Sequence, residues 1–281
     1  MKHTETTIRT SDAFDLYMQS WQPDDLPKAV LGIVPGFGEH SGRYIYPADY
    51  LSAHGIAIYG VDLRGHGKSP GQRGHVDSWG DYREDVEAFT RELGKQHSER
   101  PHFLLGHSMG GLILLNTVLH GLESSETTIK GIIASSPLLA SPSTVTPFSQ
   151  AALRGLNKIV PKAKLATKLN GDMISRDLSE CVRYVNDPLT HTMLSPRWAC
   201  EAELAIKWNQ EHAAEFPLPL LIYHGTGDQL VPIEGSRKFF ASVEHEDKTL
   251  IEYPNGFHEL HNDLDRELVF ANLEEWIEAR L

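Results

Sequence analysis

The feature that most constrains the fold of this chain is a set of six short runs that are apolar on consecutive residues. The runs are Ala29–Val34, Ile56–Val61, His102–Leu105, Ile129–Ala134, Leu218–Tyr223 and Thr249–Tyr253. Consecutive apolar residues suit strands of a parallel sheet, because helices cover both faces of such a sheet. Helical patterns separate the runs, so the sequence predicts a mostly parallel, doubly wound α/β sheet. Functional sites in such sheets lie at the carboxyl ends of the strands.

Residue patterns also indicate the elements around this sheet. Thr6–Thr10 and Phe14–Trp21 flank a short polar turn, which predicts an antiparallel hairpin at one edge. Two further segments place apolar residues on one helical stripe. The stripes are Tyr82, Val86, Phe89 and Leu93 in a helix over 79–96, and Leu264, Leu268, Leu273 and Trp276 near the C-terminus.

Residues 137–217 break the alternation of strands and helices. Prolines open and close this segment, and its pattern is mostly helical. Loops of such length without structure are rare in compact domains, so we expect a helical cap over the carboxyl edge of the sheet. The predicted organisation is therefore a core formed by 1–136 and 218–281, with the cap inserted at 137–217.

Composition excludes several classes of protein. The 26 basic and 38 acidic residues give a net charge of −12, so phosphate repulsion argues against nucleic-acid binding. The N-terminus lacks the apolar core of a signal peptide, and no run reaches the length of a membrane span. Cys181 and Cys200 show neither a disulfide framework nor metal-ligand spacing. We expect a cytoplasmic protein without a metal site.

Gly106-His107-Ser108-Met109-Gly110 fits the nucleophile-elbow pattern G-x-S-x-G. The pattern is weak alone, but here it follows an apolar run and precedes a helical stretch, 111–120, as the elbow requires. Glycines are needed because the serine adopts a strained backbone conformation in a tight turn. Ser108 is the predicted nucleophile, and we expect His107 to take no direct part in catalysis.

A serine hydroxyl needs a base to remove its proton, and an acid to orient that base. In this topology the acid and the histidine follow later strands in that order. Asp228 follows the run 218–223, and His258 follows the run 249–253. They are the predicted acid and base, whereas His224 is expected to pack or cap locally.

The tetrahedral intermediate of acyl transfer needs backbone donors for its oxyanion. The N–H of Met109, directly after the nucleophile, is one predicted donor. The second is expected in the turn Pro35-Gly36-Phe37-Gly38, where glycines allow close approach of the backbone. We assign it to the N–H of Phe37.

Several longer motifs resemble the monoacylglycerol lipase and lysophospholipase branch of the α/β-hydrolase superfamily of serine hydrolases. The matching segments span nearly the whole chain. They are the Gly36–Tyr44 loop, Asp62–Ser69, Arg73–Val76, Gly106–Gly111, Asn186–Leu189, His224–Asp228 and His258–His261.

This resemblance implies the α/β-hydrolase fold, hydrolysis of lipid monoesters such as monoacylglycerols, no cofactor, and a mobile cap that presents an acyl tunnel to lipid. By position it also implies that Glu39, Arg43 and His261 line a polar pocket for the glycerol head group. A buried cluster of this kind discriminates for hydroxyls. The alternative is that Glu39 and Arg43 form an ion pair that only shapes the loop. This chain departs from the family at Pro35, where a histidine is usual, which bears on the orientation of the oxyanion loop.

The segment 144–171 of the expected cap is basic in an acidic chain. It carries Arg154, Lys158, Lys162, Lys164 and Lys168 and no acidic residue before the end of the segment at Gly171. Phe148, Ala152, Leu156 and Ile159 fall close to one helical stripe. Such a helix can lie on an anionic membrane surface. The alternative is a solvated helix that packs its apolar face on the sheet.

The sequence leaves two alternatives to lipid monoester hydrolysis. A hydrolase of the same fold can act on another bond, as a lysophospholipase, aminopeptidase or perhydrolase. A ligand receptor can keep the fold without catalysis. The complete set of Ser108, Asp228 and His258 argues against a receptor, because binding alone does not need all three.

Overall fold

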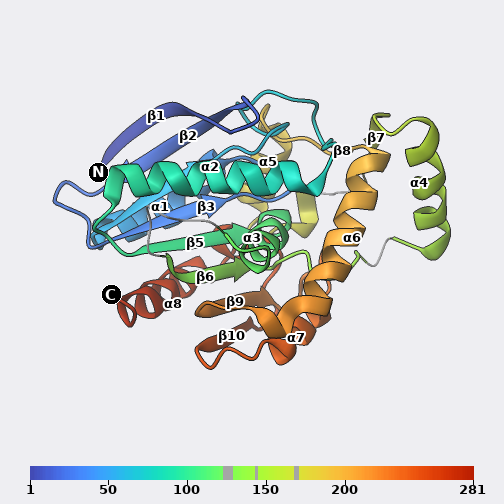
Figure 1. Ribbon diagram of the computed structural model, residues 1–281. Coiled ribbons are helices and arrows are strands. Elements are labelled where there is room, and N and C mark those ends of the chain that lie inside the picture. The colour runs from blue at the N-terminus through green and yellow to red at the C-terminus, as the bar shows by residue number, and fades with distance from the viewer. Residues whose placement is uncertain (123–128, 143–144, 168–170) are drawn as a thin grey trace.

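The computed structural model describes residues 1–122, 129–142, 145–167 and 171–281. Its main sheet has eight strands in the order β1-β2-β4-β3-β5-β6-β9-β10 (Figure 1). The strands are β1 Lys2–Arg9, β2 Asp15–Gln22, β3 Ala29–Val34, β4 Ile56–Val61, β5 His102–His107, β6 Ile129–Ser135, β9 Leu220–Gly225 and β10 Lys248–Tyr253. β1 and β2 form the antiparallel hairpin, β2 runs antiparallel to β4, and the remaining pairs are parallel. The predicted α/β-hydrolase sheet is confirmed.

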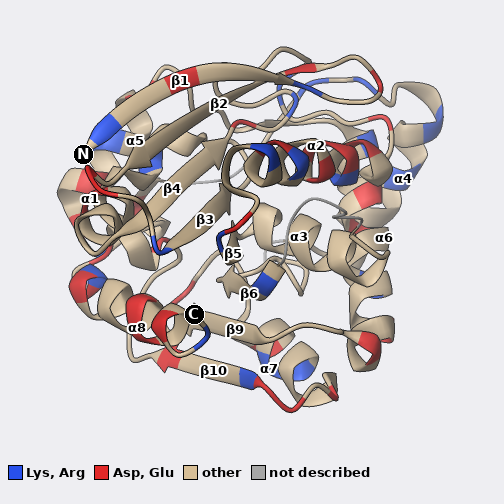
Figure 2. Cartoon of the chain, turned by 60° about the vertical axis from the view of Figure 1, so that its left-hand side comes forward, with Lys and Arg blue, Asp and Glu red and all other residues tan. Residues whose placement is uncertain are grey.

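Strand ends differ slightly from the apolar runs. β9 begins at Leu220, two residues later than the run, because Pro219 has no N–H for the ladder. β5 and β9 extend two residues further, to His107 and Gly225. The strands at the centre of the sheet carry no charged side chains (Figure 2), as burial on both faces requires.

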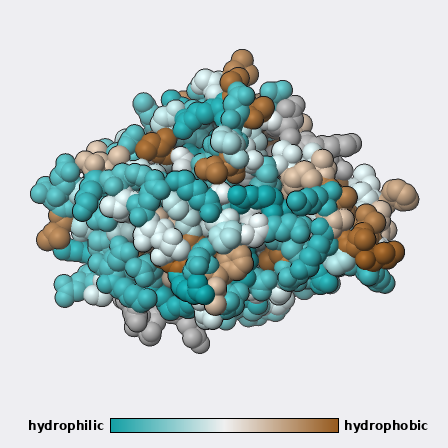
Figure 3. Space-filling view, turned by 90° about the horizontal axis from the view of Figure 1, so that it is seen from above, coloured by the Kyte–Doolittle hydropathy of each residue, from teal (hydrophilic) through white to brown (hydrophobic). Residues whose placement is uncertain are grey.

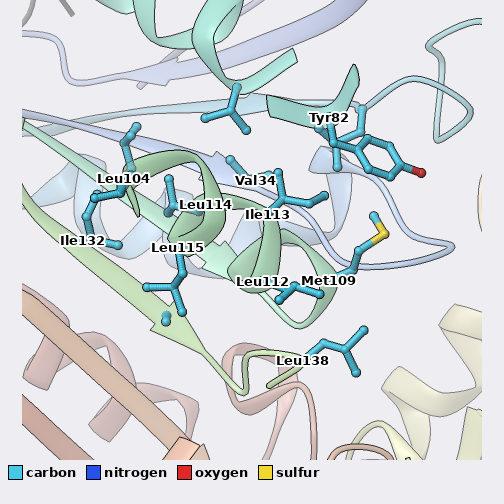
Figure 4. Packing of buried hydrophobic residues seen from close by; sticks show 14 of the residues in the cluster. Val34, Tyr82, Leu104, Met109, Leu112, Ile113, Leu114, Leu115, Ile132 and Leu138 are labelled. Atoms are coloured by element: carbon cyan, nitrogen blue, oxygen red, sulfur yellow. The ribbon is translucent and has the colours of Figure 1, made fainter. Parts of the chain in front are cut away.

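Two helical layers cover the sheet. One layer contains α2 Trp79–His97, α3 Met109–Leu119 and α7 Ile233–Ser242, and the other contains α1 Ile45–Ala53 and α8 Arg266–Glu278. Figure 4 shows the first layer: residues 112–115 of α3 lie among Val34, Leu104 and Ile132 of the sheet and Tyr82 of α2. α3 is buried almost throughout, so the residue that precedes it is held rigidly.

The predicted C-terminal stripe is half wrong. Leu273 and Trp276 are buried, but Leu264 is 62% exposed and Leu268 is 56% exposed. Leu264 precedes the helix, which begins at Arg266. Leu268 lies five residues before Leu273, which turns it by about 140° from the buried side. Val269, Phe270 and Ile277 complete the buried face instead.

Between β6 and β9 the described chain forms α4 Pro147–Ile159, β7 Leu165–Ala166, α5 Leu178–Asn186, β8 Met193–Leu194 and α6 Pro196–His212. Short 3-10 helices lie at Ser41–Tyr44, Gly171–Met173, Ala213–Glu215 and Leu260–Asn262. α4 and α6 stand at one end of the sheet (Figure 1). The segment is helical, as expected, while the division of the chain at 136 and 217 stays a prediction.

The helix α4 is amphipathic, but it buries none of its residues. Phe148 is 85% exposed and Ile159 is 80% exposed. The alternative prediction that this helix packs its apolar stripe on the sheet is therefore wrong. Lys168 lies outside the described residues. No helix in the described ranges is long and apolar enough to cross a membrane.

Candidate active site

Ser108 occupies a strained turn between β5 and α3. Its φ of 50° and ψ of −114° lie outside the regions that non-glycine residues prefer. The turn is closely packed, because a Cβ on Gly106 would lie 2.5 Å from the Gly110 carbonyl oxygen, and one on Gly110 would lie 2.1 Å from that of Val34. Only glycine fits at either position. The predicted elbow geometry is present.

Asp228 and His258 meet at the ends of β9 and β10. His258 Nδ1 and Asp228 Oδ2 are 2.6 Å apart and hydrogen-bonded. The other oxygen of Asp228 accepts from the N–H groups of Leu230 at 2.8 Å and Val231 at 2.9 Å. These bonds fix the carboxylate on its loop and aim it at one ring nitrogen of the histidine.

The electrostatics of this pair follow from burial and contact. Burial lowers the pKa of the His258 imidazole, but the adjacent Asp228 carboxylate outweighs burial, so the pKa is raised above its ordinary value. For Asp228 burial raises the pKa, and the two histidines beside it hold the pKa well below its usual range. The carboxylate is therefore ionised at neutral pH and favours the protonated imidazole.

A second histidine contacts the same carboxylate. His224 Nε2 lies 3.0 Å from Asp228 Oδ2, and its Nδ1 lies 2.8 Å from Ser236 Oγ. From its place in the sequence, His224 is expected to pack or cap locally, without a contact to the predicted acid. The close spacing of His224 and Asp228 in the sequence is the signal that predicts this contact. β9 ends at Gly225, and the turn that follows brings Asp228 back to the end of that strand.

Ser108 and His258 line one cavity of about 380 Å³ at the carboxyl edge of the sheet. Gly36 and Phe37 of the predicted oxyanion loop line it as well. Apolar side chains from the segment between β6 and β9 form much of its wall; among them are Leu153, Met173, Ile174, Leu194 and Ile206. The cavity is thus mostly apolar, with a few convergent polar groups, as is usual for a small-molecule site.

The oxyanion loop is held from two sides. The Gly36 N–H donates to the Glu39 carboxylate, and the N–H of His191 donates to the Gly38 carbonyl at 2.9 Å. The ring of Phe37 lies 4.3 Å from that of Trp198, between ring centroids. Gly38 has a φ of 73°, and a Cβ there would lie 2.1 Å from the His191 carbonyl oxygen. The backbone at Phe37 is therefore fixed although Pro35 replaces the usual histidine.

Glu39, Arg43 and Glu259 form a buried ionic cluster beside the cavity. Arg43 donates to Glu259, and its Nε lies 3.6 Å from Glu39 Oε2. Burial, with the negative charge of Glu259, raises the pKa of Glu39 to about 7. For Glu259 burial raises the pKa, but Arg43 outweighs burial and the pKa is lowered. Glu259 is thus ionised at neutral pH, whereas Glu39 titrates near pH 7.

Of the three residues predicted to bind the head group, one lines the cavity and two do not. Glu39 lines the cavity together with Glu259, which the sequence analysis did not assign to the site. Arg43 and His261 are buried and do not line the cavity. His261 stacks on Tyr44 with ring centroids 4.5 Å apart, and burial lowers the pKa of its imidazole to about 4. The ion pair weighed as an alternative is therefore present.

Comparisons with known proteins show the family to which this chain belongs. Residues 25–265 match the Hydrolase_4 family, described as "Serine aminopeptidase, S33". The chain is 32% identical to a monoacylglycerol lipase of Mycolicibacterium smegmatis over 93% of this chain and 92% of that protein. It is 33% identical to the phospholipase YtpA of Bacillus subtilis over 90% and 96%.

The fold comparison gives the same result. The crystal structure of a Paleococcus ferrophilus monoacylglycerol lipase superposes with a TM-score of 0.83 at 30% identity, covering 100% of both chains. The chain therefore belongs to the Hydrolase_4 family as a monoacylglycerol lipase-like α/β-hydrolase, and it is a carboxylic-ester hydrolase.

Proposed function

We propose that the chain hydrolyses monoacylglycerols or similar lipid monoesters through an acyl-enzyme on Ser108. His258 takes the Ser108 proton as the oxygen attacks the ester carbonyl, and Asp228 stabilises the imidazolium that forms. The backbone N–H groups of Phe37 and Met109 bind the oxyanion. The alcohol leaves with the proton from His258, and water then releases the fatty acid by the same steps in reverse. The single observation that carries this proposal is the hydrogen-bonded Asp228–His258 pair, whose histidine lines the same cavity as the strained Ser108.

The cavity wall supports an acyl ester as the substrate. Apolar side chains such as Leu153, Ile174 and Ile206 line it, and they favour an acyl chain because each buried CH₂ contributes about 0.8 kcal/mol. Glu39 and Glu259 line the same cavity, and in this proposal their carboxyl groups accept hydrogen bonds from the hydroxyls of a glycerol head group. Arg43 and His261 act indirectly in this proposal, by fixing these carboxyl groups from behind.

The same carboxyl groups favour monoacylglycerol over lysophospholipid. Two carboxylates and one guanidinium leave the Glu39, Arg43 and Glu259 cluster with a net charge of −1, or 0 when Glu39 is protonated. A phosphate near this cluster meets no net positive charge, whereas a neutral polyol meets acceptors. We therefore expect faster hydrolysis of monoacylglycerols than of lysophospholipids of the same acyl chain.

Two assays test this function. A fluorophosphonate probe should label the protein, and Ser108→Ala should abolish both labelling and ester hydrolysis, whereas Ser98→Ala, an exposed serine just after α2, should change neither. A fatty-acid release assay should then compare glycerol esters of graded chain length, lysophospholipids and aminoacyl anilides. Retained hydrolysis in Ser108→Ala, or preference for the anilides, would contradict the proposal.

We further propose that α4 contacts the membrane surface from which the lipid is taken. Phe148, Leu156 and Ile159 are exposed on a helix that also carries Arg154 and Lys158. Figure 3 shows hydrophobic side chains gathered at the right-hand end of the molecule, where α4 stands in Figure 1. Apolar and basic groups together suit the interface of an anionic bilayer.

Sedimentation with liposomes tests the membrane contact. Binding should require anionic lipid, weaken with added salt, and fall at least tenfold in Phe148→Ser/Ile159→Ser. Leu26→Ser is the matched control, since Leu26 is 83% exposed in the loop between β2 and β3, away from α4. Equal binding by both variants, or no dependence on lipid, would contradict this contact.

A further inference from the structure

The carboxylate of Asp263 is completely buried beside the loop that carries His258. Its Oδ2 accepts from the Phe257 N–H at 2.9 Å and from Arg176 Nε at 2.9 Å. Its Oδ1 accepts from the backbone N–H groups of Arg176 at 2.8 Å and Leu264 at 2.9 Å. The side chain of Asp263 has 0% exposure. A buried carboxylate with this many donors is fixed in position.

The two residues that flank His258 in the chain both donate hydrogen bonds from their backbone N–H groups. The Phe257 N–H donates to Asp263, and the Glu259 N–H donates to the Ile174 carbonyl at 2.7 Å. Ser175 Oγ donates to the Asn262 carbonyl at 2.9 Å. Residues 174–176 lie between β7 and α5, far along the chain from β10. The position of His258 is therefore set by a segment outside its own loop.

We propose that Asp263 is a positioning residue for His258, with Arg176 as the cation that holds its charge in place. The inference rests on the proposed function, because it takes His258 as the base. Asp263 touches neither Ser108 nor Asp228, and it acts by fixing the backbone at Phe257. Catalysis is sensitive to such placement, because a shift of about 1 Å in a catalytic group can cost about 100-fold in rate.

The test compares two aspartates that bind the same arginine. Arg176 Nη2 donates to Asp265 at 2.7 Å, and Asp265 is 48% exposed. Asp263→Asn turns one oxygen into an NH₂ group that faces N–H donors, so it loosens the loop while keeping the shape of the side chain. We expect it to lower kcat about 10- to 100-fold with little change in KM. Asp265→Asn should leave both constants within about twofold.

A pH profile separates positioning from a general loss of stability. The carboxylates of Asp228, Glu259 and Glu39 act on His258. The centroid of its ring lies 4.7 Å from that of the His107 ring, which in turn contacts His261. The contact with Asp228 raises the pKa of His258, so a misplaced ring loses part of that rise. In Asp263→Asn the acid limb of the kcat profile should move to lower pH, and in Asp265→Asn it should not move.

The remaining outcomes distinguish a failure of the positioning role from a failure of the proposed function. If Asp263→Asn does not fold, Arg176→Gln is measured in its place. We expect Arg176→Gln to lower kcat about three- to tenfold and to move the acid limb of the kcat profile to lower pH. A folded variant with the kinetics and pH profile of Asp265→Asn would overturn the positioning role. Hydrolysis that survives in Ser108→Ala would instead overturn the proposed function, independently of the aspartates.

Discussion

Two parts of the segment over the sheet differ in how they are attached. The outer helix α4 buries no residue, and the ion pair between Arg154 and Glu203 joins it to α6. Residues 174–191 of the same segment are hydrogen-bonded to two loops of the candidate site: Ile174 and Arg176 to the loop of His258, and His191 to the predicted oxyanion loop. The segment therefore has an outer helix at the surface and an inner part, residues 174–191, that forms a frame around the candidate active site.

The first prediction concerns the hydrogen bond between Asp228 and His258. Asp228→Asn keeps the shape of the acid but favours the wrong tautomer of His258, so kcat should fall by about 10⁴. Activity of the unmodified enzyme should fall as the pH drops below the raised pKa of His258, because the base is then protonated. Loss of the Asp228 charge should move that limb to lower pH. His224→Ala, which removes only the second histidine on Asp228, should have a smaller effect.

The second prediction concerns the contact between the inner part and the oxyanion loop. Gly38→Ala places a Cβ about 2.1 Å from the His191 carbonyl oxygen at a φ of 73°. The loop must shift, so kcat should fall by about 10² to 10³, as when one oxyanion donor is lost. Kinetics on a soluble short-chain ester avoid effects of lipid binding. An unchanged kcat would show that the loop orients Phe37 without this contact.

The third prediction applies the same substitution to α4. Gly155 lies in the interior of that helix, and a Cβ there meets no atom within 4 Å. Gly155→Ala should leave kcat unchanged and stabilise the helix by about 0.5–1 kcal/mol, because alanine loses less backbone entropy. Calorimetry and the same ester assay measure both effects. A large loss of activity would show that α4 also belongs to the frame.

The smallest effect is expected at the ion pair between α4 and α6. Arg154 is 60% exposed, so water and salt screen its ion pair with Glu203. Arg154→Gln should therefore hardly change the free energy of unfolding while loosening α4. Limited proteolysis should then cut near α4 faster than in Lys158→Gln, the matched control on the same helix. Equal rates would mean that this pair does not restrain α4.

The sequence predicted those parts of the site that follow from strand order. Ser108, Asp228 and His258 each lie in the turn or loop that follows an apolar run, so their position at one edge of the sheet is a consequence of topology. The frame around them depends on contacts between distant segments. Nothing in the local pattern places Arg176 on Asp263, because such a pair depends on tertiary packing.

The misassigned elements have similar causes. Leu264 lies before the first residue of α8, Arg266, and Leu268 lies five residues before Leu273, a spacing that places the two on different sides of the helix. The stripe on α4 was predicted, but periodicity does not tell which surface covers an apolar face.

The most direct test of the account is to find where the acyl group is held during turnover. The protein should be quenched in acid while it hydrolyses a monoacylglycerol, digested, and examined by mass spectrometry. We predict an added acyl mass on the peptide that contains Ser108, absent from Ser108→Ala. Hydrolysis with an acyl group on another residue, or on none while Ser108→Ala remains active, would contradict the account.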